Sequence, residues 1–395
     1  MSLPHRAPAA RAMAMASARI SLLSMCLAAS AATGSLAAVG QQAFLAPSSS
    51  VFAVPRNHQQ LCKQHRARRR SITAASAAAT SRMSAVASET AITDSAGGVE
   101  TRTWRWKGYD IRYKVASEGS DGPPMVLVHG FGGNADHWRK NIPTLAETGP
   151  VYAIDLLGYG FSSKPDPGPW EERNSIYSFE TWSEQLRDFV TEIVGRPVFM
   201  VCNSVGGVAG LQAGVDAPKQ VLGVVLFNIS LRMLHTKKQA PAGRPFVTGL
   251  QYVLRETQIG PLFFGSVAKP KAITNILKQC YGDPDQVTEE LVEYILTPGL
   301  EAGAVKVFLD FISYSGGPLP EELLEAIKVP VTIAWGDQDP WEPVELGKEL
   351  AAFDAVEGFV ELPGAGHCPM DEAPHLTDPV VLDFVAKHFN KKISK

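Results

Sequence analysis

The sequence predicts an α/β domain, in which helices flank a mostly parallel central sheet and a helical cap is inserted. Short β-branched apolar runs recur after residue 104, and helical patterns lie between them, which is typical of such a sheet. The alternation stops between Asn228 and Lys328 and then returns, which indicates an inserted element. We therefore expect one domain over residues 104–395, with the cap at about 229–328.

The strands are predicted from short apolar runs. Trp104–Val115 alternates around a Lys-Gly step and indicates two paired strands. Several later runs are apolar on both faces, as strands buried inside a parallel sheet are. These runs are Met125–His129, Val151–Asp155, Val198–Cys202, Val221–Phe227, Val329–Trp335 and Phe359–Leu362.

Helical spacing is clearest in two segments. One apolar stripe follows intervals of three and four residues, which places its members on one face of an amphipathic helix. A second helical pattern runs from about Pro379 to Phe389. The members of the first stripe are Phe179, Trp182, Leu186, Phe189 and Ile193.

The N-terminal leader differs in charge from the rest of the chain. No Asp or Glu precedes Glu89, whereas residues 1–88 hold ten of the 37 basic residues. The other 27 basic residues stand against all 40 acidic ones, a formal charge of −13. A basic, acid-free leader rich in Ala and Ser is typical of an organelle-import presequence. We expect residues 1–88 to be a disordered presequence and residues 89–103 to be a linker.

An uncharged stretch inside the leader leaves its type open. Ile20 to Val39 is apolar or small throughout, and Arg66–Arg70 follows it. The stretch is either a signal-peptide core in a bipartite leader, the hydrophobic patch of a single transit peptide, or a membrane anchor. Its Ala and Ser content makes it weakly hydrophobic for a spanning helix.

Composition excludes several classes of function. A negatively charged body without blocks of Lys or Arg argues against nucleic-acid binding, which depends on neutralising phosphates. The body holds three widely spaced cysteines, Cys202, Cys280 and Cys368, and no CxxC. This pattern indicates neither a disulfide framework nor a zinc site.

A serine stands at a predicted strand-to-helix junction. The run Val198–Asn203 ends directly before Ser204, and a helical pattern follows. A sharp turn there would expose the serine hydroxyl as a nucleophile, provided that the neighbouring residues are small. Gly206 and Gly207 meet that need, whereas Cys202 replaces the first glycine of G-x-S-x-G. The alternative is a glycine-rich turn that only lets the helix pack close to the sheet.

A serine hydroxyl is a weak nucleophile and needs a base, oriented by an acid. His367 follows the last predicted strand, and Asp337 and Asp339 follow the one before. We expect His367 to be the base and Asp339 to orient it, while Asp337 shapes the turn. The chain order of Ser204, Asp339 and His367 is the order of the α/β-hydrolase triad.

A glycine-rich loop, Val128–Gly133, follows the first buried strand. Acyl transfer develops negative charge on a carbonyl oxygen, which preorganised backbone N–H groups stabilise. The N–H groups of Phe131 and Val205 are the candidate oxyanion hole. A phosphate-binding loop is disfavoured because no Lys-Ser/Thr follows. We expect His129 to support this loop rather than to react.

These motifs together resemble the α/β-hydrolase superfamily. The finer resemblance is to plastid enzymes that remove phytol from chlorophyll pigments, the chlorophyll dephytylases, with pheophytinases more distant. It extends from about Trp104 to Phe389, and Cys202 agrees with the dephytylase form. The segments that carry it are Cys202–Gly207, Asn228–His235, Tyr314–Pro320, Ala334–Pro343 and Gly364–Pro369.

The resemblance implies a serine-type carboxyl-ester hydrolase that converts chlorophyll to chlorophyllide and phytol, in a plastid and without a cofactor. The leader would then be a plastid-targeting presequence. Alternatives on the same fold are a pheophytin, lipid-ester or carbon–carbon bond hydrolase. From a different class, a non-catalytic binding protein of this fold is a further alternative.

The predicted insertion is unusually apolar between Phe246 and Val267. Such a segment is either a cap helix packed on the core or a roof that encloses a long apolar tail or touches the thylakoid membrane. The start of the insertion is basic and either meets anionic headgroups or is a solvated loop. Its basic side chains are Arg232, His235, Lys237, Lys238 and Arg244.

Overall fold

The computed structural model describes residues 98–171 and 176–393, with side chains up to Phe389. The expected presequence, its uncharged stretch from Ile20 to Val39, and residues 89–97 of the expected linker lie outside the described residues.

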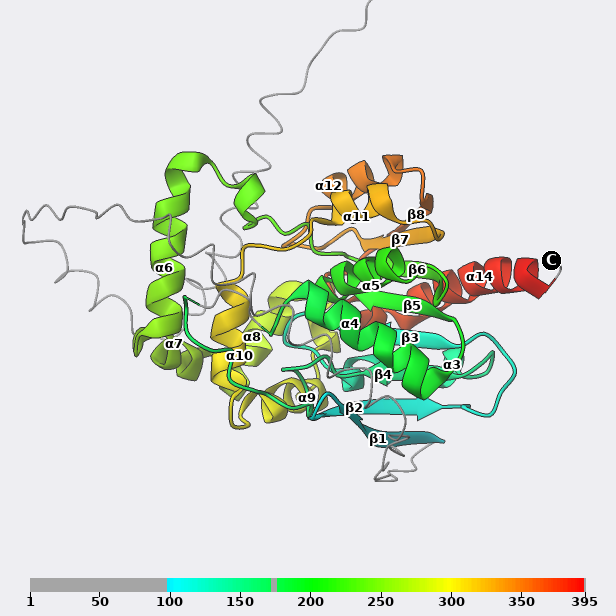
Figure 1. Cartoon of the computed structure of the whole chain (residues 1–395), viewed down its shortest axis with the longest axis horizontal. Helices are drawn as coiled ribbons and strands as arrows, with labels where there is room; N and C mark the ends of the chain where they lie inside the picture. The colour runs from blue at the N-terminus through cyan, green and yellow to red at the C-terminus, as the bar shows by residue number, and fades with distance from the viewer. Residues whose placement is uncertain (1–97, 172–175, 394–395) are drawn as a thin grey trace, which may run out of the picture. The chain divides into compact units, whose positions relative to one another are not determined.

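One sheet of eight strands forms the centre of the described chain (Figure 1). Its order is β1-β2-β4-β3-β5-β6-β7-β8; β2 pairs antiparallel with β1 and β4, and all other pairs are parallel. The predicted α/β class with a mostly parallel sheet is therefore confirmed. The strands are β1 (Val99–Trp106), β2 (Tyr109–Ala116), β3 (Met125–Val128), β4 (Val151–Ile154), β5 (Val198–Asn203), β6 (Val221–Phe227), β7 (Val331–Gly336) and β8 (Val356–Leu362).

The first strand begins five residues earlier than the sequence predicts. Val99 pairs with Ala116, so residues 99–103 belong to the sheet and not to a linker. This part of β1 is an edge strand with half-buried polar residues, and it carries no apolar alternation to reveal it. Antiparallel pairing with β2 places it in the sheet, and Arg102 also contacts Glu118, just after β2, at 2.8 Å.

Buried side chains on both faces of the sheet explain why the central strands lack an apolar–polar alternation. Val126 and Val128 of β3 point into a core shared with helices α4 and α5, whereas Met125 and Leu127 point into the opposite core. Helices cover both faces (Figure 1). The helices outside the insertion are α3 (Ile142–Leu145), α4 (Phe179–Phe189), α5 (Val205–Asp216), α12 (Val344–Lys348), α13 (Pro369–Glu372) and α14 (Pro374–Ile393), together with short 3-10 turns at Ala135–Trp138 and Glu349–Ala352.

Both helices predicted from apolar spacing are present. The first stripe forms α4, followed by a π-helical turn over Val190–Val194 that ends at Gly195 with φ 71°. Ser178 caps α4, since its hydroxyl accepts a hydrogen bond from the Thr181 N–H. The second pattern forms α14, which begins at Pro374 rather than at Pro379.

The chain between β6 and β7 is helical. Helix α11 packs against α5, and Leu323, Leu324 and Ile327 join the core of the sheet. Helices α6 and α7 contact α10 and lie on its far side from the sheet (Figure 1). No helix in the described part of the chain is both long and apolar enough to cross a membrane. The helices are α6 (Arg244–Glu256), α7 (Ile259–Val267), α8 (Pro270–Cys280), α9 (Glu289–Gly299), α10 (Ala304–Ile312) and α11 (Pro320–Ala326), with 3-10 turns at Thr236–Lys238, Pro241–Gly243 and Pro284–Gln286.

Candidate active site

The carboxyl ends of the parallel strands lie at one edge of the sheet. Asn203, the last residue of β5, pairs with Phe227 at the end of β6. Gly336 at the end of β7 pairs in turn with Leu362 at the end of β8. Because the loops after these ends start side by side, residues far apart in sequence meet there.

Ser204 occupies a strained turn between β5 and α5. Its backbone has φ 53° and ψ −123°, a conformation that non-glycine residues rarely adopt. Gly206 permits the turn, since a Cβ atom there would lie 2.4 Å from the His129 carbonyl oxygen. The geometry is that of a nucleophile elbow.

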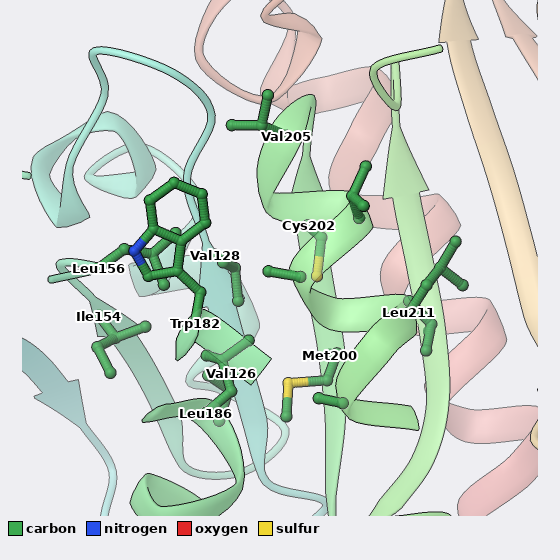
Figure 2. Packing of buried hydrophobic residues seen from close by; sticks show 14 of the residues in the cluster. Val126, Val128, Ile154, Leu156, Trp182, Leu186, Met200, Cys202, Val205 and Leu211 are labelled. Carbon is green, nitrogen blue, oxygen red and sulfur yellow. The ribbon is translucent and has the colours of Figure 1, made fainter. Parts of the chain in front are cut away.

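Cys202 takes the place of the usual glycine because α5 leaves room for it. Its side chain is completely buried among the apolar residues of β3, β5 and α5 (Figure 2). A Cβ atom on Gly210 would lie 2.5 Å from the Cys202 Sγ atom. Burial also raises the pKa of the Cys202 thiol, which disfavours a reactive thiolate. Cys202 is therefore a packing residue.

Ser204, His367 and Asp339 form one hydrogen-bonded chain. The distance from His367 Nε2 to Ser204 Oγ is 2.9 Å, and His367 Nδ1 lies 2.6 Å from Asp339 Oδ2. A carboxylate only accepts, so Nδ1 carries the proton and Nε2 is left to accept the serine hydroxyl. All three residues are buried, with exposures of 6%, 5% and 7%. Such a chain can activate the hydroxyl for attack.

Asp339 is fixed by three further donors. Asn228 Nδ2 donates to Asp339 Oδ2 at 2.8 Å, and the N–H groups of Trp341 and Glu342 donate to Oδ1 at 2.9 and 3.1 Å. Asn228 is itself held, since its Oδ1 accepts from the Gly336 N–H at 3.0 Å. Asp337 is placed differently: it accepts from the Gly364 N–H at 2.8 Å and shapes the turn, as predicted.

The loop of His367 is held by residues that sequence reasoning missed. Asn203 Nδ2 donates to the His367 carbonyl at 3.0 Å, and the His367 N–H donates to the Cys280 carbonyl at the end of α8 at 2.7 Å. Burial lowers the pKa of His367, but Asp339 and Glu342 outweigh it, so its pKa lies above the usual value. Neither support carries a local sequence signal, because each depends on a partner far away along the chain.

The loop after β3 packs directly against the elbow. A Cβ atom on Gly130 would lie 2.9 Å from the Ser204 Cβ atom. His129 accepts from the Leu156 N–H at 3.1 Å through Nε2 and donates from Nδ1 to the Gly130 carbonyl at 2.8 Å. It supports the loop, as predicted.

Val205 opens α5, so its N–H lacks an intrahelical partner. The oxyanion role of the Phe131 and Val205 N–H groups stays a prediction.

Aromatic side chains connect this loop to the insertion. The Phe131 ring stacks on Phe311 at 5.0 Å and lies 5.4 Å from Phe308, both on α10. Phe308 in turn lies 6.3 Å from Phe263 and 5.2 Å from Phe264, both on α7. All five rings are partly exposed. They offer a continuous apolar wall from the candidate oxyanion loop to α7.

The basic start of the insertion is largely engaged within the protein. Lys237 and Lys238 pair with Glu322 and Glu321 of α11. Arg232 donates to the Pro318 carbonyl at 2.7 Å and lies over the ring of Phe179. His235 Nε2 lies 2.9 Å from the Gly317 carbonyl. These contacts brace the insertion against the core, and a contact of this segment with anionic headgroups stays a prediction.

Comparison with known proteins identifies the family to which this architecture belongs. The model of the alpha/beta hydrolase family matches residues 125–378 of the chain. The chain is also similar to the chloroplastic pheophytinase of Arabidopsis thaliana, at 28% identity over 311 residues. That alignment covers 70% of this chain and 63% of the pheophytinase, so the chain spans less than two thirds of that relative's length.

Two further similarities come from outside plastids. The (lyso)-N-acylphosphatidylethanolamine lipase of Homo sapiens is 26% identical over 288 residues, covering 68% of this chain and 80% of the lipase. Among solved structures, a serine hydrolase involved in carbazole degradation matches with a TM-score of 0.58 and 22% identity. It covers 72% of this chain and 98% of its own, and supports the fold alone.

Proposed function

Since this chain belongs to the alpha/beta hydrolase family, we propose that it is a serine-type carboxyl-ester hydrolase that removes phytol from chlorophyll. The observation that carries the proposal is the buried chain from Ser204 through His367 to Asp339. The family match supports hydrolase activity, and the three hydrogen-bonded residues support an ester as the substrate.

In the acylation step, Ser204 Oγ attacks the carbonyl carbon of the ester while His367 Nε2 takes its proton. The Asp339 carboxylate holds the Nδ1–H tautomer and stabilises the imidazolium that forms. The carbonyl oxygen becomes an oxyanion, to which the Phe131 and Val205 N–H groups would donate. The two N–H groups would thus stabilise the carbonyl oxygen, the atom on which the negative charge develops.

In the second half, the imidazolium returns its proton to the alcohol oxygen, and phytol leaves with that hydrogen. Water then donates a proton to His367 Nε2 and attacks the acyl carbon. When the second tetrahedral intermediate collapses, the bond from the acyl carbon to Ser204 Oγ breaks. His367 Nε2 returns its proton to that oxygen, and chlorophyllide leaves as the free acid. No step uses Cys202, because its thiol is buried against Gly210.

The pigment substrate is supported by resemblance and by apolar surface. The segments Asn228–His235 and Tyr314–Pro320 resemble the dephytylases, and the pheophytinase is a chloroplast protein. The aromatic wall from Phe131 to α7 would suit a long isoprenoid alcohol. The basic, acid-free leader would deliver the chain to the plastid, where that substrate is found.

The exposed apolar residues of α6 and α7 would let the insertion touch the thylakoid surface without spanning it. Phe246 and Leu262 are 71% and 75% exposed, and Ile259 and Tyr252 are also exposed. Contact would rest on these side chains rather than on the paired lysines 237 and 238.

A serine-directed fluorophosphonate separates an enzyme from a binding protein of the same fold. We expect the probe to label the wild-type chain and not the Ser204→Ala variant. Circular dichroism of both proteins would check that the variant is folded. A wild-type chain that resists the probe at neutral pH would count against the mechanism.

Substrate class needs a direct comparison. Purified protein is incubated separately with chlorophyll a, pheophytin a, and a short-chain p-nitrophenyl ester, and the products are chromatographed. We expect phytol and chlorophyllide from chlorophyll a. Turnover of pheophytin alone would favour a pheophytinase, and turnover of the short ester with both pigments intact would overturn the pigment assignment.

A further inference from the structure

A buried glutamate lies beside the site and has no part in the mechanism above. Glu342 follows Asp339 by three residues, in the loop after β7. Its N–H donates to Asp339 Oδ1 at 3.1 Å, and its carbonyl accepts from Trp335 Nε1 at 2.9 Å. The backbone of Glu342 is therefore fixed by the acid on one side and by the strand on the other.

The side chain of Glu342 reaches toward the nucleophile. Its Oε1 atom accepts from the Leu231 N–H at 3.1 Å and from the Ser230 hydroxyl at 3.3 Å. The Ser230 N–H donates to the Ser204 carbonyl at 3.2 Å. One carboxyl thus connects the loop of Asp339 to the first residues of the insertion, which touch the elbow.

The charge of this carboxyl is poorly compensated. Glu342 is 8% exposed, and within the described residues its Oε2 atom has no hydrogen-bond partner. Burial, and then the negative charge of Asp339, raise the pKa of Glu342 to about 7. The charged groups that face it are Asp339 and His367; Ser230 and Leu231 contribute dipoles. A buried carboxyl without full pairing costs stability, so its presence beside the site invites a functional explanation.

We propose that Glu342 is a positioning residue: it ties Ser230 and Leu231 to the loop of Asp339, and its negative charge favours the protonated form of His367. The inference rests on the proposed role of His367 as the base. The imidazolium forms in each proton transfer, so a second nearby anion, which Glu342 supplies above about pH 7, lowers the free energy of that state. Asp339 orients the His367 ring through a hydrogen bond, whereas Glu342 acts on that ring through its electric field.

The decisive experiment is a nuclear magnetic resonance titration of the His367 ring in the wild-type chain and in Glu342→Gln. Glutamine keeps an oxygen that can accept from Leu231 but removes the charge. We expect the pKa of His367 to fall by about half a unit, because a screened charge at short range has this effect. Glu345→Gln, an exposed site on α12, is the matched control and should leave the pKa unchanged.

The kinetic readout should move in the same direction. In Glu342→Gln the acid limb of kcat/KM for the short ester should shift to lower pH, and kcat above pH 8 should fall about threefold with KM unchanged. Glu342→Asp keeps the charge and should restore both. A lower melting temperature with the His367 titration and pH profile unmoved would reduce Glu342 to a structural role and overturn the proposal.

The two proposals fail in different ways. If the wild-type chain cleaves no ester while Glu342→Gln still lowers the pKa of His367, the proposed function is wrong and the electrostatic coupling stands. If esters are cleaved and the titration is unmoved, the function stands and the coupling is wrong. Should Glu342→Gln not fold, Glu342→Ala, which also removes the charge, takes its place, and a His367 pKa at the wild-type value would overturn the coupling.

Discussion

The site at the strand ends and the outer helices of the insertion are built in opposite ways. Asp339 accepts hydrogen bonds from four groups, those of His367, Asn228, Trp341 and Glu342. On α6 and α7, by contrast, large apolar side chains point to solvent. The difference indicates that the sheet edge fixes the chemistry, while the insertion is free to define what is recognised.

The largest effect on activity should come from substituting the candidate nucleophile, Ser204, in the site at the strand ends. Ser204→Ala is expected to lower kcat by about 10⁴-fold or more on every ester tested, because no other described group replaces the hydroxyl. Initial rates with the short p-nitrophenyl ester and with chlorophyll a measure it. Thermal unfolding of the variant is the control. If the variant were unfolded at the assay temperature, its loss of activity would not identify Ser204 as the nucleophile.

Packing under the elbow should give the next largest effect. Gly210→Ala places a Cβ atom near Cys202 Sγ and is expected to lower the free energy of unfolding by about 1–3 kcal/mol. Cys202→Gly in the same chain should recover part of that loss, since it removes the clashing side chain. Urea unfolding of the two single variants and the double variant tests this, and purely additive losses would contradict the packing account.

The aromatic wall should separate long substrates from short ones. Phe308→Ala is expected to raise KM for the phytyl substrate by roughly tenfold, while leaving the short ester within about twofold. The reason is that Phe308 links the rings of Phe131 and Phe264 in the apolar wall, whereas the hydrogen-bonded chain consists of Ser204, His367 and Asp339. Steady-state kinetics on both substrates measures the split; an equal rise for both esters would place Phe308 in general support of the loop.

The smallest effect on stability belongs to the outer surface of the insertion. Leu262→Ser should change the free energy of unfolding by less than about 0.5 kcal/mol, because the side chain is 75% exposed. The Leu262→Ser variant should nevertheless bind lipid vesicles less tightly, which co-sedimentation can measure. Val267→Ser, buried on the same helix, is the matched control and should lose stability instead.

The fold could be predicted, and Ser204 could be proposed as the nucleophile, because their signals are local. The run Val198–Asn203 and the glycines after Ser204 report a strand and a turn without reference to distant parts of the chain. Asn228 and Glu342 could not be assigned this way. Each acts through a hydrogen bond to a residue 111 positions away in the sequence. Its role therefore depends on how the chain folds back to the sheet after the insertion.

The same limit explains one expectation that needed revision and one contact that the sequence did not reveal. Residues 99–103 looked like a linker because an edge strand with polar side chains has no apolar alternation. The basic start of the insertion was compatible with a lipid contact or a solvated loop, and nothing in the sequence indicated that Lys237 and Lys238 pair with the acidic first turn of α11. Charge patterns in the sequence identify the charges but not their partners.

The bond between the His367 N–H and the Cys280 carbonyl bears on how such a protein can be re-engineered. A designer who treats the helices between β6 and β7 as an exchangeable cassette would remove the acceptor that fixes the histidine loop. A chimera with a foreign insertion would then need a replacement carbonyl at the end of α8. The insertion and the sheet are therefore not independent modules, since this bond adds to the contacts of Glu342 with Ser230 and Leu231 and of Phe131 with α10.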